Sequence, residues 1–192
     1  LVEEAGGAPL RFGILPDRRE ALESALRSAL DACDLVVVTA GSSASTRDLT
    51  AQVIDSLGRP GVLVHGVNVR PGKPTILGVC GGTPVVGLPG NPVSALVIAR
   101  LFVVPLVERL LGLEVRQRPS VTARLAVNLP SQAGREDWVP VRLTSKPDGW
   151  LAEPIFYKSN LIFTLAQASG LLRIPPDATG LEAGSAAQVE LL

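Results

Sequence analysis

The chain has 192 residues, of which 46% are hydrophobic, 19% charged and 4% aromatic, and its formal net charge is zero. This size and composition fit one large or two small folded domains and argue against a disordered chain. The balanced charge and the scarcity of aromatic rings argue against a nucleic-acid-binding surface, and no apolar run reaches the roughly 20 residues that span a bilayer.

Strands and helices alternate over the first half of the chain. The apolar run 10–15 predicts a strand, and Asp17 is the expected cap of a helix in which Leu22, Leu26 and Leu30 recur on one face. Further elements are expected as strands at 35–38, 61–67, 75–79 and 83–87 and helices at 48–58 and 92–111. This alternation predicts an α/β fold with a mostly parallel, three-layer sheet domain.

The last helix of this half contains two signals for its own shape. Pro105 lies inside it and predicts a kink or break near Leu101, because proline lacks the N–H that a continuous helix needs. Gly112 is placed to end the helix.

The second half contains short strands separated by turns. Strands are expected at 121–127, 138–143, 150–153, 171–174 and 188–192, with one short helix at 159–168. This pattern predicts a small, mainly antiparallel β domain. The expected domains are therefore residues 1–117 and 118–192.

Two cysteines, Cys33 and Cys80, lie in apolar surroundings without metal-ligand spacing. Buried free thiols are the favoured interpretation, and a disulfide is the alternative. Free thiols favour the cytoplasm.

Two glycine–proline turns lie one predicted strand apart and carry the main functional signal. The first, Pro71-Gly72-Lys73-Pro74, holds a lysine, and the second, residues 87–94, opens onto the long helix. Glycine allows close approach of a ligand, lysine supplies a positive charge, and a helix start supplies free N–H groups. The pattern predicts a site for a phosphate or another oxyanion on a small molecule.

A loop rich in small polar residues, 39–48, follows the predicted strand 35–38. Strand ends of this kind bind ligands in open α/β sheets, and a simple turn is the alternative. Asp48 is either a magnesium ligand or a helix cap, and Asn91 is a cap, a ligand contact or both. His65, the only histidine, is expected to pack at a strand end rather than to act in catalysis.

These motifs carry a resemblance to a known family. The string Asp-Leu-Val-Val-Val-Thr-Ala-Gly-Ser-Ser at 34–43, the pairs Arg47-Asp48 and His65-Gly66, and the two turns at 70–74 and 87–94 resemble the molybdopterin molybdenumtransferase family, of the MoeA and gephyrin E-domain type. The residues 166–175 resemble the C-terminal β domain of that family.

The resemblance implies a molybdopterin-binding α/β domain and an enzyme that inserts molybdate into adenylylated molybdopterin, with Mg²⁺, and releases AMP. It implies catalytic roles for Asp48 and Lys73, with Asp48 also the metal ligand. The substrate-binding residues that it implies are Gly41, Ser42, Ser43, Pro71, Gly72, Lys73, Pro74, Gly87, Pro89, Gly90, Asn91, Pro92 and Ser94.

The chain departs from the family pattern in two ways. Ala40 and Ser45 stand where glycine is usual, and the family's earlier Gly-Asp-Glu segment, with the first strand of this domain, is absent. We therefore expect a C-terminal fragment that is inactive alone, from a cytoplasmic protein that is a homodimer at full length and has no nucleic-acid or membrane partner. A non-catalytic module or scaffold that binds molybdopterin or a nucleotide is the alternative, and an unrelated phosphate-binding α/β enzyme is a third.

Overall fold

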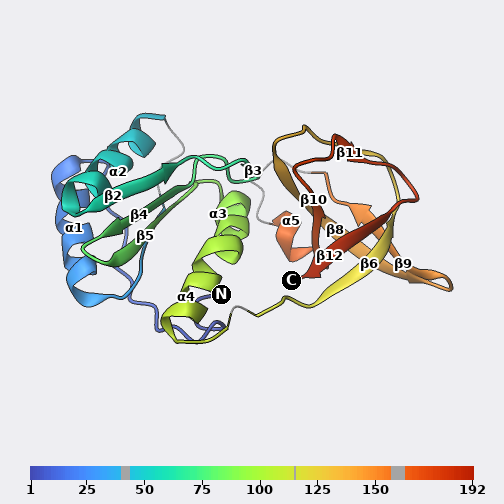
Figure 1. Ribbon diagram of the computed structural model, residues 1–192, viewed down its shortest axis with the longest axis horizontal. Helices are drawn as coiled ribbons and strands as arrows, with labels where there is room; N and C mark the ends of the chain where they lie inside the picture. The colour runs from blue at the N-terminus through green and yellow to red at the C-terminus, as the bar shows by residue number, and fades with distance from the viewer. Residues whose placement is uncertain (40–43, 115, 157–162) are drawn as a thin grey trace. The chain divides into compact units, whose positions relative to one another are not determined.

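The structure, a computed structural model, describes residues 1–39, 44–114, 116–156 and 163–192 (Figure 1). The chain divides into two compact units. The first comprises residues 1–67 and 72–115, and the second comprises residues 68–71 and 116–192. A four-residue segment of the first half thus belongs to the second unit.

The first unit contains four strands and a set of helices. Its elements are α1 (Arg19–Ala32), β1 (Val36–Thr39), α2 (Ala44–Leu57), β2 (Pro60–His65), β4 (Ile76–Cys80), β5 (Thr83–Leu88), α3 (Pro92–Ile98), the π-helix η1 (Ala99–Val103) and α4 (Val104–Leu110).

The sheet of the first unit is mixed, with the strand order β1-β5-β4-β2. Only β1 and β5 are parallel, whereas β4 pairs antiparallel with both β5 and β2. The prediction of a mostly parallel sheet is therefore wrong. The physical reason lies in the connections, because only Gly81 and Gly82 separate β4 from β5, and a two-residue link joins antiparallel neighbours.

Three local predictions near the N-terminal end of this unit also differ from the structure. Residues 10–15 form no strand, because no backbone hydrogen bond joins them to the rest of the described chain. Arg18, not Asp17, occupies the cap position of α1, without a side-chain cap hydrogen bond. The second helix begins at Ala44, so Asp48 lies inside it.

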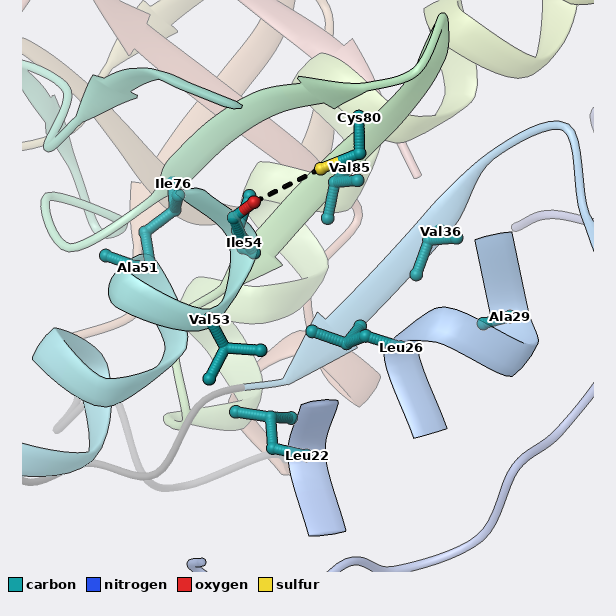
Figure 2. Packing of buried hydrophobic residues seen from close by; sticks show 10 residues of the cluster. All are labelled: Leu22, Leu26, Ala29, Val36, Ala51, Val53, Ile54, Ile76, Cys80 and Val85. Carbon is teal, nitrogen blue, oxygen red and sulfur yellow. Dashed lines mark hydrogen bonds between the residues drawn. The ribbon is translucent and has the colours of Figure 1, made fainter. Parts of the chain in front are cut away.

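The core of the first unit forms between α1, α2 and the sheet (Figure 2). Leu22, Leu26 and Ala29 are the buried residues of α1, at the helical spacing expected for one apolar face. They pack with buried residues of α2 and the strands, namely Val36, Ala51, Val53, Ile54, Ile76, Cys80 and Val85.

The helix after β5 changes its winding before its proline, at the position where the sequence predicts a kink or a break. Between α3 and α4 lies η1, a π-helical turn over Ala99–Val103. Its wider winding accommodates the missing N–H of Pro105, the second residue of α4. Gly112 ends the segment with a φ of 73°, and the Leu113 N–H donates to the Glu108 carbonyl, which closes a Schellman-type cap.

The second unit is mainly antiparallel, as predicted, and it closes into a five-stranded barrel. The barrel order is β10-β12-β6-β9-β8, closed by pairing of β8 with β10, and only β6 and β9 are parallel within it. Its elements are β3 (Val69–Arg70), β6 (Ser120–Leu125), β7 (Leu129–Pro130), β8 (Glu136–Lys146), β9 (Gly149–Pro154), α5 (Phe163–Ala166), β10 (Gly170–Ile174), β11 (Gly180–Leu181) and β12 (Ala186–Leu191).

β3 adds to the barrel at the outer side of β8, in parallel. The barrel interior is apolar and includes Val141, Leu172 and Val189, each fully buried. The part of the chain that the structure describes contains no helix with the length and hydropathy needed to cross a bilayer.

Both cysteines are free thiols, and only Cys80 is buried. The Cys80 Sγ–H donates to the Ile54 carbonyl at 3.3 Å (Figure 2). Burial, and secondarily the negative charge of Asp55, raises the pKa of the Cys80 thiol from its usual 9.0. The neutral thiol therefore contributes stability that is complete below the pKa of the unfolded chain and is lost as the pH rises through the folded value.

We expect a thiol reagent at pH 8 to modify half-buried Cys33 in the native protein and to leave Cys80 unmodified until the protein unfolds. Mass spectrometry of peptides after labelling measures both sites. In the Cys33→Ser variant the native protein should remain unlabelled. Equal labelling rates at the two cysteines would contradict this assignment.

Candidate functional site

The predicted site segments are attached to neighbouring strand ends at one end of the sheet of the first unit. Thr39 at the end of β1 is the parallel partner of Leu88 at the end of β5, and Ile76 at the start of β4 is opposite Gly87. The loop after β1, the turn after β5 and the turn before β4 are therefore attached to adjacent strand ends. The sequence motifs that prompted the prediction are thus neighbours in this sheet, although 50 residues separate Ala40 from Gly90 in the sequence.

The lysine turn is held by backbone hydrogen bonds of the first unit. The Val67 N–H donates to the Lys73 carbonyl at 2.9 Å, and the Gly66 N–H donates to the Thr75 carbonyl at 2.8 Å. These bonds hold the backbone at Lys73 and Thr75, and the side chain of Lys73 is exposed. A fixed backbone with a free ammonium group suits a site for an anion.

Two residues that have no distinctive sequence signal, Thr75 and Ile98, stabilise this turn. Thr75 is fully buried, and its hydroxyl donates to the Gly72 carbonyl at 2.6 Å. Gly72 lies directly against the Ile98 side chain of α3 with a φ of 136°. The signal for Thr75 was present as a threonine next to the Lys-Pro pair, but a threonine at a strand start is too common to be distinctive.

The second turn combines buried and exposed residues. Gly87 and Pro89 are buried, whereas Gly90 and Pro92 are exposed and Asn91 is half-buried. Asn91 occupies the cap position of α3 without a side-chain cap hydrogen bond. Ser94 is only 5% exposed, so it lies under the surface of this segment. The exposed part of this turn is therefore the segment 90–92, in which Asn91 is half-buried.

Asp48 is exposed in α2, four residues after the helix begins, so the interpretation as a helix cap is wrong. Residues 41–43 of the predicted phosphate loop, and Ala40, lie outside the described residues. Within the described part of the chain, no three His, Cys, Asp or Glu side chains cluster as a metal site. Asp48 is thus a single carboxylate on a helix that follows the loop.

His65 lies at a strand end, and two arginines of the second unit form ion pairs. His65 is the last residue of β2, as expected, but it is exposed rather than packed there. Arg124 pairs with Asp148 at 2.9 Å and Arg118 with Glu190 at 3.8 Å, both within the second unit. None of these observations points to a catalytic role.

A cleft of about 760 Å³ opens in the first unit. Thr39, Gly90 and Asn91 line part of it, together with Leu49 and Thr50 of α2. The rest is lined by α1, β1 and residues 10–18. The cleft therefore reaches the sheet edge at which the motif segments begin.

Two known families match the chain. Residues 1–109 match the family described as "Probable molybdopterin binding domain", and residues 122–192 match "MoeA C-terminal region (domain IV)". The first match alone covers more than half of the chain.

Curated relatives and solved structures agree with these matches. Molybdopterin molybdenumtransferase 2 of Mycobacterium tuberculosis is 34% identical over 96% of this chain and 44% of its own length. The molybdopterin molybdenumtransferase of Nostoc is 30% identical over 96% of this chain and 43% of its own. The crystal structure of a molybdopterin biosynthesis MoeA protein from Pyrococcus horikosii superposes with a TM-score of 0.82 and 39% identity, covering 98% of this chain and 45% of that protein.

The chain thus spans less than half the length of these relatives. The motif turns and the mixed sheet lie within the first matched region, and nearly all of the β barrel lies within the second. The two matched regions are the molybdopterin-binding domain and the C-terminal region. The chain belongs to the molybdopterin molybdenumtransferase family.

Proposed function

We propose that the first unit binds adenylylated molybdopterin at the sheet edge formed by β1, β5 and β4, and that the full-length protein inserts molybdate there and releases AMP. The observation that carries this proposal is the register, which attaches all three motif segments to adjacent strand ends. Family membership supports the substrate class, because the relatives are named molybdopterin molybdenumtransferases.

In this proposal the lysine turn and the Gly-Asn turn bind the anionic part of the substrate. Lys73 neutralises phosphate charge from a backbone that hydrogen bonds already hold in place. The Gly72–Pro74 turn, the backbone at Gly90 and Asn91, and the polar loop residues Gly41, Ser42 and Ser43 supply the remaining contacts. Their contribution is to position the reacting groups and to stabilise charge rather than to form a covalent intermediate.

Asp48 is the residue that we propose for magnesium. Mg²⁺ keeps several waters and commonly takes one or two protein carboxylates plus substrate phosphates, so a single exposed carboxylate fits this type of site. The ion would shield the phosphate charge during transfer. We further propose a cytoplasmic protein that is a homodimer at full length, as the family resemblance implies.

For this chain alone we propose ligand binding without turnover. It spans less than half the length of its relatives, and we propose that groups which complete the active site lie in the part that it does not span. The purified chain should bind the pterin and release no AMP. Release of AMP by the chain alone would contradict this part of the proposal.

The Lys73→Ala variant is expected to bind adenylylated molybdopterin about ten- to a hundredfold more weakly, because it loses one charge-assisted contact worth roughly 1.5–3 kcal/mol. Isothermal titration of the purified chain measures the dissociation constant. Asp48→Asn should weaken binding only when Mg²⁺ is present.

The matched control is Lys146→Ala, which removes an exposed lysine at the end of β8 in the second unit. Its affinity should change less than about twofold. If Lys73→Ala, Asp48→Asn and Lys146→Ala all bind like the unaltered chain, the proposed site is wrong.

A further inference from the structure

The peptide unit between Gly72 and Lys73 has its two polar groups in different roles. Its carbonyl, on Gly72, accepts a hydrogen bond from the Thr75 hydroxyl at 2.6 Å. Its N–H, on Lys73, donates to no acceptor among the residues that the structure describes. The carbonyl of this peptide unit is therefore occupied inside the first unit, whereas its donor is available to a ligand.

Peptide geometry links these two groups. The bond between Gly72 and Lys73 is trans, and in a planar trans peptide the C=O and the N–H point in opposite directions. A hydroxyl that holds the Gly72 carbonyl therefore also sets the direction of the Lys73 N–H. This hold matters at Gly72, because glycine permits backbone rotations that residues with a side chain resist.

The contact that sets this direction is shielded from water. Thr75 is fully buried, so water does not compete for its hydroxyl. Its own carbonyl accepts a hydrogen bond from the Gly66 N–H at 2.8 Å, which fixes Thr75 to the segment that precedes β3. The hydroxyl thus acts on the Gly72 carbonyl from a fixed point in the fold.

The direction of this peptide unit decides which charge the turn presents to an anion. A backbone N–H carries partial positive charge and attracts an oxyanion, whereas a carbonyl oxygen repels it. In the observed direction Lys73 offers both its N–H and an exposed ammonium group. A reversed peptide would place the Gly72 carbonyl oxygen on that side and oppose the charge of the lysine.

A competing explanation is that the hydroxyl only closes a local turn. Threonine and serine hydroxyls commonly bond to a carbonyl three residues earlier. The second unit contains such a bond, in which the Ser185 hydroxyl donates to the Glu182 carbonyl at 2.6 Å. The same spacing and length occur at Thr75 and Gly72, so the Ser185 bond is a matched control for loss of turn closure alone.

We propose that Thr75 is a positioning residue of the anion site. Its buried hydroxyl holds the Gly72–Lys73 peptide with the carbonyl inward and the N–H toward the phosphate of the ligand, beside the Lys73 ammonium group. Thr75 acts through this peptide and does not touch the ligand. The inference rests on the proposed function, because it requires the lysine turn to bind the anionic part of the pterin.

Two substitutions of Thr75 separate positioning from stability. Thr75→Val keeps the shape and removes the hydroxyl, so the dissociation constant for adenylylated molybdopterin should rise about tenfold. Thr75→Ser keeps the hydroxyl and removes a buried methyl group, so the dissociation constant should change less than about twofold. Both variants should unfold at a lower urea concentration than the unaltered chain. A purely structural role would instead make affinity follow stability in both variants.

Amide hydrogen exchange by NMR follows the direction of the peptide. Addition of adenylylated molybdopterin should slow exchange of the Lys73 amide in the unaltered chain and in Thr75→Ser, because the ligand accepts its hydrogen bond. This slowing should be lost in Thr75→Val. The control Ser185→Ala removes the matched bond in the second unit and should change affinity less than about twofold.

The outcomes distinguish this inference from the proposed function. Equal affinity of Thr75→Val and the unaltered chain, or equal weakening in Thr75→Val and Thr75→Ser, would overturn the positioning role. The Lys73→Ala variant is measured alongside. If Lys73→Ala binds more weakly and Thr75→Val does not, only the role of Thr75 is wrong. If Lys73→Ala also binds like the unaltered chain, the proposed function is wrong and this inference with it.

Discussion

Replacing Asp137 by alanine is expected to lower the free energy of unfolding by about 3–5 kcal/mol. Asp137 is 3% exposed in β8, and the Arg135 guanidinium donates to both of its oxygens, at 2.7 and 3.0 Å. Arg70 of β3 lies 3.7 Å from the same carboxylate. Alanine would leave the partly buried Arg135 without its counter-charge, and breaking a buried pair costs far more than the pair contributes by its presence.

Urea unfolding followed by tryptophan fluorescence measures this effect, since Trp138 is adjacent and buried. Arg70→Ala is the matched control, because Arg70 is 64% exposed and its loss should cost less than about 1 kcal/mol. The loss of unfolding free energy in Arg135→Lys should lie between those of Arg70→Ala and Asp137→Ala, because an ammonium group cannot bind both carboxylate oxygens in the same plane. Similar losses of unfolding free energy for Arg70→Ala and Asp137→Ala would show that the buried Arg135–Asp137 pair contributes no more than the exposed Arg70 contact.

The sequence predicts the type of an element correctly where its apolar residues recur with a clear period and the folded element has a neighbour to pack or pair with. The helix 19–32 and the strands near 36–39, 76–80 and 83–88 follow from leucine spacing and β-branched runs, whose signals are local. Residues 10–15 have the same apolar composition but no backbone hydrogen-bond partner among the described residues. Composition indicates that a segment can form a strand, and only a partner makes it one.

Strand direction was predicted incorrectly although the necessary signal was present. Gly81-Gly82 between two apolar runs is a hairpin turn, and a hairpin makes β4 and β5 antiparallel. β2 and β4 are linked without an intervening helix, which also disfavours a parallel pair. Alternation of strands and helices indicates an α/β fold, whereas the length of each connection fixes the relative direction of the strands that it joins.

The candidate site was predictable as motifs and not as contacts. Turn residues such as Gly72 and Gly90 are conspicuous in the sequence because glycine frees the backbone and the neighbouring prolines restrict it. Burial of Ser94 and the hydroxyl contact from Thr75 to Gly72 depend on how α3 packs against the strands. The pairing of β3 with β8 has no sequence signal, since a two-residue strand has no period.

Replacing Gly72 by alanine is expected to lower the free energy of unfolding by about 2–4 kcal/mol. Two costs combine at this position. Its φ of 136° is one that L-residues rarely adopt, and a Cβ there would overlap the Cγ1 and Cδ1 atoms of Ile98. Ile98 is fully buried at the end of α3 and has little room to move. The strain would also displace the backbone of Lys73, so binding of the proposed pterin ligand should weaken together with stability.

The Gly149→Ala variant measures the cost of the backbone angle without the cost of an overlap with a neighbouring side chain. Gly149 has a φ of 124°, and a Cβ there would meet nothing within 4 Å, so this variant should lose only the conformational part, about 1–2 kcal/mol. In an Ile98→Ala background the overlap is removed, and Gly72→Ala should then cost about as much as Gly149→Ala, which a double-mutant cycle in urea measures. A Gly72→Ala cost that is unchanged by Ile98→Ala would mean that the contact between the lysine turn and α3 does not constrain the turn. In that case displacement of Lys73 would have to arise from the backbone angle at Gly72 alone.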